Sequence, residues 1–328
     1  MKRITLNLFF CCLTMGAFAQ QPLGGFLYGT EAEPKGTEWE APEKLSLNKE
    51  QPRAYFFSFA DVESARRVQP EASSYWQSLN GTWKFHWAPN PDERPKAFYE
   101  TQFDVAAWDD ITVPSCWNVV GIQKDGSLKY GVPIYCNQPV IFKHTKVVGD
   151  WKGGVMRGPN KDWTTYKYRN EVGSYRRTFR IPEDWREREV YINFDGVNSF
   201  FYLWINGKYV GFSKNSRNTA SFNISDYLVK GENMVAVEVY RNSDGSFLEA
   251  QDMYRLPGIF RDTYLTSTSK VELRDMKINT DLTAGGASVE VNAMLRNLGA
   301  KAVKGYSLTY SVYQNKLYCR AGGKTCCF

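Results

Sequence analysis

The chain has 328 residues, a formal net charge of +6 and an aromatic content of 15%. Its Lys and Arg residues are scattered rather than gathered in a stripe, so the charge does not indicate nucleic-acid binding. No apolar run reaches the length of about 20 residues that spans a bilayer, and seven cysteines in so long a chain do not indicate a disulfide scaffold.

Residues 1–19 have the pattern of an export signal. Lys2 and Arg3 precede a short apolar run from Leu6 to Met15, and Ala17-Phe18-Ala19 fits a small-x-small cleavage pattern. We therefore expect residues 1–19 to be a signal peptide and the mature chain to be periplasmic or secreted.

Residues 20–50 are rich in Gly, Pro, Glu and Lys and lack periodicity, which predicts an N-terminal arm laid over the fold or a mobile segment. Residues 51–265 instead alternate as short strands, and Asn206-Gly207 is a strong hairpin signal between two of them. Strands are expected over residues 79–87, 111–113, 173–181, 189–194, 199–205, 208–212 and 233–241, with short helical turns at 104–108 and 222–228. Closely spaced strands without amphipathic helices predict an all-β, two-sheet sandwich.

A second, incomplete unit is expected over residues 266–316. Residues 270–279, 287–298 and 303–313 alternate like strands, which is too few for a complete sandwich of about seven. Residues 317–328 leave this pattern and contain three cysteines, so we hypothesise that this atypical tail is a frameshifted or truncated end.

The stretch from Ser243 to Asp262 follows a strand in which Val235, Val237 and Val239 alternate with polar or small residues, so one strand face is expected to be buried. In this stretch acidic and basic residues are interleaved with large apolar ones. Such charges must be paired, exposed or used on a ligand, because an unpaired buried charge is costly. On the residues alone, a salt-bridged aromatic loop that closes the sandwich is the commoner explanation.

The same stretch resembles, in order and spacing, part of the sugar-binding domain of bacterial β-galactosidases of glycoside hydrolase family 2. The matching runs are Ser-Asp-Gly-Ser from residue 243, Gln-Asp-Met from 251 and Gly-Ile-Phe-Arg-Asp from 258. Further similar runs are Leu79–Trp83, Val113–Trp117, Pro133–Asn137, Phe194–Ser199, Trp204–Gly207 and Gly231–Asn233. The resemblance implies a galactose-binding-like jelly-roll β-sandwich over residues 51–265, followed by the start of an immunoglobulin-like β-sandwich over 266–316.

Two substrate-binding positions carry over from this resemblance. Asn137 matches an asparagine that hydrogen-bonds galactose hydroxyls, and Asp252 matches an aspartate that contacts the sugar and binds a sodium ion. The residues alone explain Asn137 equally well as a turn residue, and they favour Asp252 as a partner of Arg255 or Arg261.

The family also binds magnesium. Asp244 matches a residue at a peripheral magnesium site of some members. Glu38 stands where an aspartate is usual, and Ala41 stands where a side-chain oxygen is usual. The resemblance therefore does not carry over a complete magnesium site.

In this family the sugar-binding domain lends loops to an active site on a separate barrel, whose two glutamates perform retaining hydrolysis. A (β/α)₈ barrel needs about 250 residues, and we expect this chain to end before one begins. The implied function is the N-terminal portion of a β-galactosidase acting on β-galactosides such as lactose. We expect it to be inactive alone, and to need its barrel or a complementing chain. The family resemblance also implies a homo-oligomer for the full-length enzyme.

Two alternatives stay open. The chain could be a free-standing exported carbohydrate-binding module, although such a module is not expected to expose Phe247, Met253, Tyr254 and Phe260 together. It could also belong to an enzyme with a different family 2 activity, either β-glucuronidase or β-mannosidase.

Overall fold

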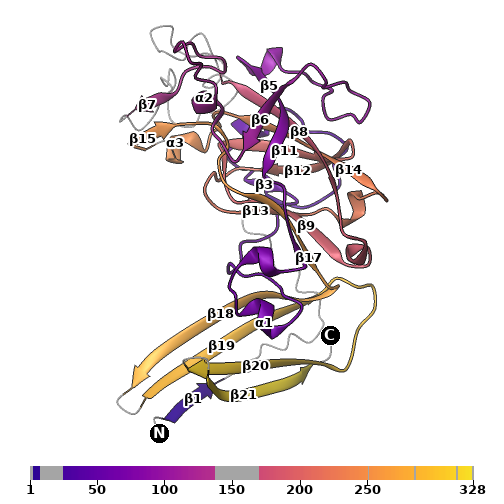
Figure 1. Cartoon of the computed structure of the whole chain (residues 1–328), viewed down its shortest axis with the longest axis vertical. Coiled ribbons are helices and arrows are strands. Elements are labelled where there is room, and N and C mark those ends of the chain that lie inside the picture. Colours follow the sequence, from indigo (N-terminus) through magenta and orange to yellow (C-terminus); the bar gives the residue numbers. More distant parts are fainter. Residues whose placement is uncertain are drawn as a thin grey trace. The chain divides into compact units, whose positions relative to one another are not determined.

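The computed structural model describes residues 3–7, 25–136, 170–249, 251–283, 286–314 and 317–326. The chain divides into two units (Figure 1). The larger unit contains residues 22–51 and 57–267, and the smaller one contains residues 1–21, 52–56 and 268–328. Both are built from β-strands, as the sequence predicts.

The larger unit is a jelly-roll sandwich of an eight-stranded and a four-stranded sheet. The large sheet has, in spatial order, β2 (Phe26–Leu27), β3 (Ser46–Leu47), β12 (Lys208–Ser213), β11 (Phe200–Ile205), β14 (Glu232–Tyr240), β8 (Val172–Arg180), β5 (Gly81–Ala88) and β6 (Asp109–Val113). The small sheet has β13 (Ala220–Asn223), β9 (Glu189–Phe194), β17 (Thr263–Thr268) and β4 (Trp76–Ser78).

Two short ribbons and several helical turns complete this unit. β10 (Val197–Asn198) pairs with β16 (Gly258–Ile259), and β7 (Ile134–Cys136) pairs with β15 (Met253–Arg255). The α-helical turns are α1 (Val62–Ala65), α2 (Trp117–Val120) and α3 (Ser246–Glu249). The 3₁₀ turns are η1 (Glu38–Glu40), η2 (Pro70–Ala72), η3 (Pro91–Glu93), η4 (Glu183–Trp185) and η5 (Ser225–Tyr227).

Both faces of the large sheet are buried, whereas the sequence pattern predicted one. In β11, Phe201 and Leu203 point into the core between the sheets, and Tyr202 and Trp204 point into a second core on the opposite face. The arm covers this second face, where the Trp39 ring stacks on Tyr240 with centroids 5.3 Å apart. The arm is thus an integral layer of the fold.

Some local secondary structure differs from what the sequence predicts. The helical turn expected over residues 222–228 is confirmed for η5 (Ser225–Tyr227), whereas residues 222 and 223 end strand β13. The one expected over residues 104–108 is a non-helical turn in which the Asp104 side chain accepts a hydrogen bond from the Ala106 N–H at 2.8 Å. Strands β2 and β3 form inside the aperiodic arm, because β3 pairs with the edge of β12 and β2 pairs with β3.

The smaller unit has a three-stranded sheet, β1 (Arg3–Asn7), β19 (Gly286–Asn297) and β18 (Val271–Thr283), and a ribbon of β20 (Tyr306–Gln314) with β21 (Leu317–Cys326). The tail expected to leave the strand pattern therefore forms a strand paired with β20. Its proposed frameshift stays a prediction. The export signal also stays a prediction, and its removal would take β1 from the sheet.

Among the described residues, each helix is a turn of three or four residues, and none is long and apolar enough to cross a membrane. Cys116 carries a free, half-buried thiol, and burial raises its pKa.

Candidate functional site

Some of the residues that carry the family resemblance, those in α2, β7, α3 and β15, lie together at one end of the larger unit (Figure 1). The register of the β7–β15 ribbon places Tyr254 opposite Tyr135. Their rings lie 5.4 Å apart between centroids, and both are exposed, by 57% for Tyr135 and 66% for Tyr254. The Tyr135 hydroxyl donates to Asp252 Oδ1 at 2.6 Å. We call Tyr135, Asp252 and Tyr254 the rim site.

Asp252 is exposed, and none of the ion pairs within the described ranges includes it. The two arginines that the sequence suggested as partners of Asp252 are Arg255 and Arg261, and both have other surroundings. The Arg255 side chain is buried, and Arg261 Nη1 donates to the Arg217 carbonyl at 2.9 Å. A carboxylate fixed through one oxygen and otherwise facing solvent is able to accept hydroxyl protons from a sugar.

A buried arginine ties the two strands of the rim ribbon together. Arg241 Nη2 donates to the Val132 carbonyl at 2.9 Å, just before β7, and to the Arg255 carbonyl in β15 at 3.2 Å. Arg241 follows β14 and Glu171 precedes β8, so the pairing of these strands brings the two side chains together. Their ion pair measures 2.5 Å between Nη1 and Oε1 and is fully buried.

The other Glu171 oxygen organises the chain that leads to β7. It accepts hydrogen bonds from Trp117 Nε1 at 3.1 Å and from Asn118 Nδ2 at 3.2 Å, both in α2. Gly131 lies against the same carboxylate with φ of +76°, and a Cβ there would come within 2.5 Å of Glu171 Oε1. Only glycine fits this position, because both the space and the backbone angle exclude a side chain.

The remaining charges of the 243–262 stretch have separate partners. Glu249 accepts from the Ser216 backbone N–H at 2.8 Å and from its hydroxyl at 2.5 Å. Asp262 accepts from Asn80 Nδ2 at 2.9 Å. Of the apolar side chains expected to be exposed together, only Tyr254 is exposed. The partly buried ones are Phe247, Met253 and Phe260. Of these, Phe247 packs on the second core of its own unit.

Asp244 lies eight positions before Asp252 but is buried. Its Oδ2 accepts from Lys214 Nζ at 2.7 Å, and its Oδ1 accepts from the Gly245 N–H at 2.7 Å. Burial raises the pKa of Asp244, and the ammonium opposes that shift. Glu38 does not join this pair. It accepts from the Lys35 and Thr37 N–H groups at 2.8 and 3.0 Å and from Tyr202.

These groups do not fit a magnesium site. An ammonium already lies against Asp244, and the described ranges contain no group of three or more His, Cys, Asp or Glu side chains able to hold a metal ion. Burial would raise the pKa of Glu38, but its hydrogen bonds from Tyr202 and the backbone outweigh burial and hold it below the usual value.

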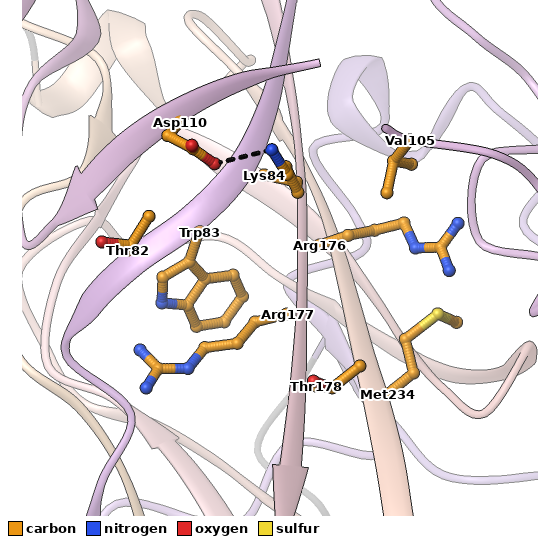
Figure 2. A pocket seen from close by; sticks show the side chains of 9 residues that line it. All are labelled: Thr82, Trp83, Lys84, Val105, Asp110, Arg176, Arg177, Thr178 and Met234. Atoms are coloured by element: carbon orange, nitrogen blue, oxygen red, sulfur yellow. Dashed lines mark ion pairs between the residues drawn. The ribbon is translucent and has the colours of Figure 1, made fainter. Parts of the chain in front are cut away.

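Two hollows of the larger unit have the position or the size of a ligand site. The one beside the rim, between Arg217, Glu249 and Tyr254, has about 20 Å³ of space, which holds one water molecule and no sugar ring. Any sugar at the rim must therefore lie on the surface of the rim site. A larger hollow of about 340 Å³ lies where β5 and β8 separate (Figure 2).

The larger hollow is large enough for a small ligand, but its charged groups already have partners. Lys84 pairs with Asp110 at 2.9 Å, as Figure 2 shows. Arg177 Nη1 donates to the carbonyls of Leu79 and Asn80 at 2.6 and 2.8 Å, which ties the two diverging strands together. We therefore interpret this hollow as a structural gap in the sheet.

Of the sequence-predicted residues, Asp252 lies at the rim, Asp244 is buried beside the arm, and Asn137 falls outside the described residues. Sequence reasoning missed Tyr135, although it lies two positions before Asn137 in the same matching run. It also missed the Glu171–Arg241 pair, for which the chain offers no local signal.

Known proteins share sequence with this chain. Residues 160–269 match the model of the sugar binding domain of glycosyl hydrolases family 2. A β-galactosidase of Priestia megaterium is 42% identical over 246 residues, covering 75% of this chain and 22% of that enzyme. A β-galactosidase of Halalkalibacterium halodurans is 40% identical over 224 residues, covering 68% of this chain and 20% of the enzyme.

Solved structures show the same fold. A Bacteroides uniformis β-glucuronidase superposes with a TM-score of 0.57 at 20% identity, covering 77% of this chain and 26% of the other. A Bacteroides vulgatus β-glycosidase gives a TM-score of 0.52 at 21% identity, covering 76% of this chain and 27% of the other.

The fold and the matched model define a jelly-roll of the type found in the sugar binding domain of this family. The chain belongs to glycosyl hydrolases family 2, and its curated relatives include β-galactosidases. It spans about a fifth of the length of these relatives.

Proposed function

We propose that this chain is the sugar-facing portion of a β-galactosidase, which lends the rim site to an active site on a separate barrel. The observation that carries the proposal is Asp252. Its carboxylate is exposed, accepts a hydrogen bond from Tyr135 through one oxygen, and forms no ion pair with an arginine among the described residues. Relatives at 40–42% identity with β-galactosidase activity in their names support galactosides as the substrate class.

The rim residues have distinct roles in this proposal. Asp252 accepts hydrogen bonds from sugar hydroxyls, and the Tyr135 hydroxyl fixes its orientation. The exposed rings of Tyr135 and Tyr254 offer apolar faces to the sugar ring. Asn137 would add an amide donor and acceptor from the chain that follows β7.

The sodium ion implied by the family resemblance would bind through Asp252. Its Oδ2 has no partner among the described residues, and a carboxylate oxygen is a suitable ligand for a hard cation. The ion would supply positive charge for the oxygens of the sugar. The peripheral magnesium is not part of this proposal, because the groups around Asp244 do not fit it.

The chemical step needs two carboxylates about 5–5.5 Å apart. We propose that the barrel supplies both, as the family resemblance implies, and that the chain alone does not hydrolyse galactosides. The physiological partners would then be a galactoside and the barrel, and the compartment would be the periplasm or the exterior.

The test is a chimaera in which this chain replaces the matching portion of the Priestia megaterium enzyme. We expect the chain alone to be inactive and the chimaera to hydrolyse galactosides in preference to glucuronides and mannosides. Asp252→Ala should lower kcat/KM by about 10–100-fold, because it removes a charged hydrogen-bond acceptor. Asp184→Ala, which changes an exposed aspartate in η4, is the matched control and should have no effect.

Two results would contradict the proposal. Millimolar or tighter binding of galactose to the chain alone, together with a chimaera indifferent to Asp252→Ala, would indicate a free-standing carbohydrate-binding module. A chimaera that prefers glucuronides or mannosides would indicate another family 2 activity.

A further inference from the structure

The N-terminal arm is fastened to the sandwich by a buried lysine. Lys214 directly follows β12, and its backbone N–H donates to the Leu45 carbonyl of the arm at 3.0 Å. Its Nζ donates to the Ala41 carbonyl of the arm at 2.7 Å and to Asp244 Oδ2 at 2.7 Å. The side chains of Lys214 and Asp244 are only 5% and 6% exposed.

The loop also contacts the arm directly. The Asp244 N–H donates to the Trp39 carbonyl at 2.9 Å, two residues from Ala41. One ammonium therefore joins a strand end, the arm and the 243–262 loop at a single buried point. We call Ala41, Lys214 and Asp244 the arm clamp.

Two of the clamp residues are Ala41 and Asp244. They occupy positions that the family resemblance assigns to a peripheral magnesium site. The third position, Glu38, directs its carboxylate to backbone N–H groups of the arm and to Tyr202. Negative charge still surrounds the clamp, since Glu38 and Glu43 both interact electrostatically with Lys214. This negative charge opposes the burial that lowers the pKa of Lys214, and the cation present at the clamp is its own ammonium.

We propose that the Lys214 ammonium replaces the divalent cation in this chain, so that the arm is fastened to the sandwich without metal. The proposal goes beyond the sugar-binding role and does not depend on it.

Geometry makes the two cations exclusive. Magnesium binds oxygen ligands at about 2.0–2.1 Å in an octahedron, whereas the ammonium holds its two oxygens at 2.7 Å. A magnesium ion bound by Ala41 and Asp244 would meet the Lys214 ammonium at the same oxygens. Like charges at such a distance repel strongly in a buried site. A tethered ammonium also cannot be removed by a chelator.

Thermal unfolding of the full chain tests the proposal. All ten tryptophans belong to the larger unit, so their fluorescence reports its unfolding separately from the smaller unit. We expect the wild-type chain to have the same Tm in excess EDTA and in millimolar MgCl₂. A Tm that rises with MgCl₂ and falls with EDTA would overturn the proposal.

Lys214→Gln removes the charge and offers a neutral oxygen of similar reach. In EDTA we expect its Tm to fall by roughly 5–10 °C, because Asp244 loses its buried partner. In MgCl₂ we expect most of this loss to be recovered, since binding to the folded state alone stabilises it. If the variant fails to fold in EDTA, recovery of folding in MgCl₂ supports the proposal, and failure in both overturns it.

Two further variants serve as controls. Lys49→Gln removes another buried lysine, whose Nζ contacts the Lys214 carbonyl but not Asp244, and should give no magnesium response. Lys214→Arg keeps a cation in the clamp and should remain indifferent to magnesium. A magnesium response in either variant would show that the ammonium of Lys214 is not what excludes the ion.

Discussion

Asp244 and Asp252 lie eight positions apart in one loop and have opposite surroundings. Asp244 is buried, and both of its oxygens are taken, by the Lys214 ammonium and the Gly245 N–H. Asp252 is exposed, and its one partner among the described residues is the Tyr135 hydroxyl. The loop thus has a structural end that fastens the arm and an exposed end, which we call the functional end because the proposed sugar contact lies there.

Burial separates a charge that contributes to stability from one that remains available to a ligand. A buried ion pair is costly to break, because removing one partner leaves the other uncompensated. An exposed carboxylate contributes little to stability and is available to a ligand. Substitutions at the two ends should therefore affect stability and sugar contact separately, and the predictions below test that separation.

The largest effect is expected at Arg241, which lies beneath the functional end but is buried. Arg241→Met should lower the free energy of unfolding by about 3–5 kcal/mol, because Glu171 would lose its buried partner. Urea denaturation followed by tryptophan fluorescence measures this. The exposed Arg186→Met, which breaks a surface ion pair with Glu183, should cost less than about 1 kcal/mol. Equal costs for the two would contradict the importance of burial here.

The direct comparison comes from matched substitutions at the two carboxylates. Asp244→Ala should cost about 3 kcal/mol, since it leaves the Lys214 ammonium buried with only the Ala41 carbonyl. Asp252→Ala should change stability by less than about 0.5 kcal/mol, as is usual for exposed positions. Chemical denaturation of both variants measures these costs. A large cost for Asp252→Ala would mean that the outer carboxylate also supports the fold.

The sequence predicted the fold where neighbouring residues carry the information. Strand β9 matches the expected residues 189–194 because its hydrophobic side chains decide its place in the sandwich. The second buried face of β14 was missed, because what covers it is Trp39, about 200 residues away. Glu238 lies on that second face, where it is buried and pairs with Arg94 at 2.9 Å.

The candidate site was predictable in part for the same reason. The run from 251 to 253 located Asp252 through resemblance, but its partner Tyr135 is 117 positions away and depends on the β7–β15 pairing. Lys214 lies in a run with no charge pattern that would point to Asp244. Such contacts are set by tertiary packing, so a single sequence does not reveal them.

Lys49 gives a smaller, pH-dependent test of the structural end. Burial lowers its pKa from 10.5 to about 8, and the Glu249 charge opposes this. Between pH 8 and 10.5 the unfolded chain then binds more protons at Lys49 than the folded chain does, so this group makes stability rise with pH. Below pH 8 its charge costs on the order of 3 kcal/mol.

Lys49→Met should remove this contribution. Relative to wild type, the variant should gain stability at pH 7 and lose that advantage by pH 10.5, as measured by urea denaturation across this window. Taking the difference between the two proteins cancels the titration of other groups. A constant difference at all pH values would show that Lys49 has an ordinary pKa in the folded chain.

The smallest change in stability, and the sharpest test of the functional end, is Tyr135→Phe. It keeps the exposed ring and removes only the hydroxyl that donates to Asp252, so stability should change by less than about 0.5 kcal/mol. In the chimaera, kcat/KM for a galactoside should fall by about 3–10-fold, the equivalent of one modest hydrogen bond, because Asp252 is no longer oriented.

Tyr254→Phe is the matched control, since that hydroxyl makes no hydrogen bond within the described residues. If Tyr135 acts through Asp252, the loss must vanish in an Asp252→Ala background. A loss of the same size in both backgrounds would show that the Tyr135 hydroxyl contacts the sugar itself and does not position the carboxylate.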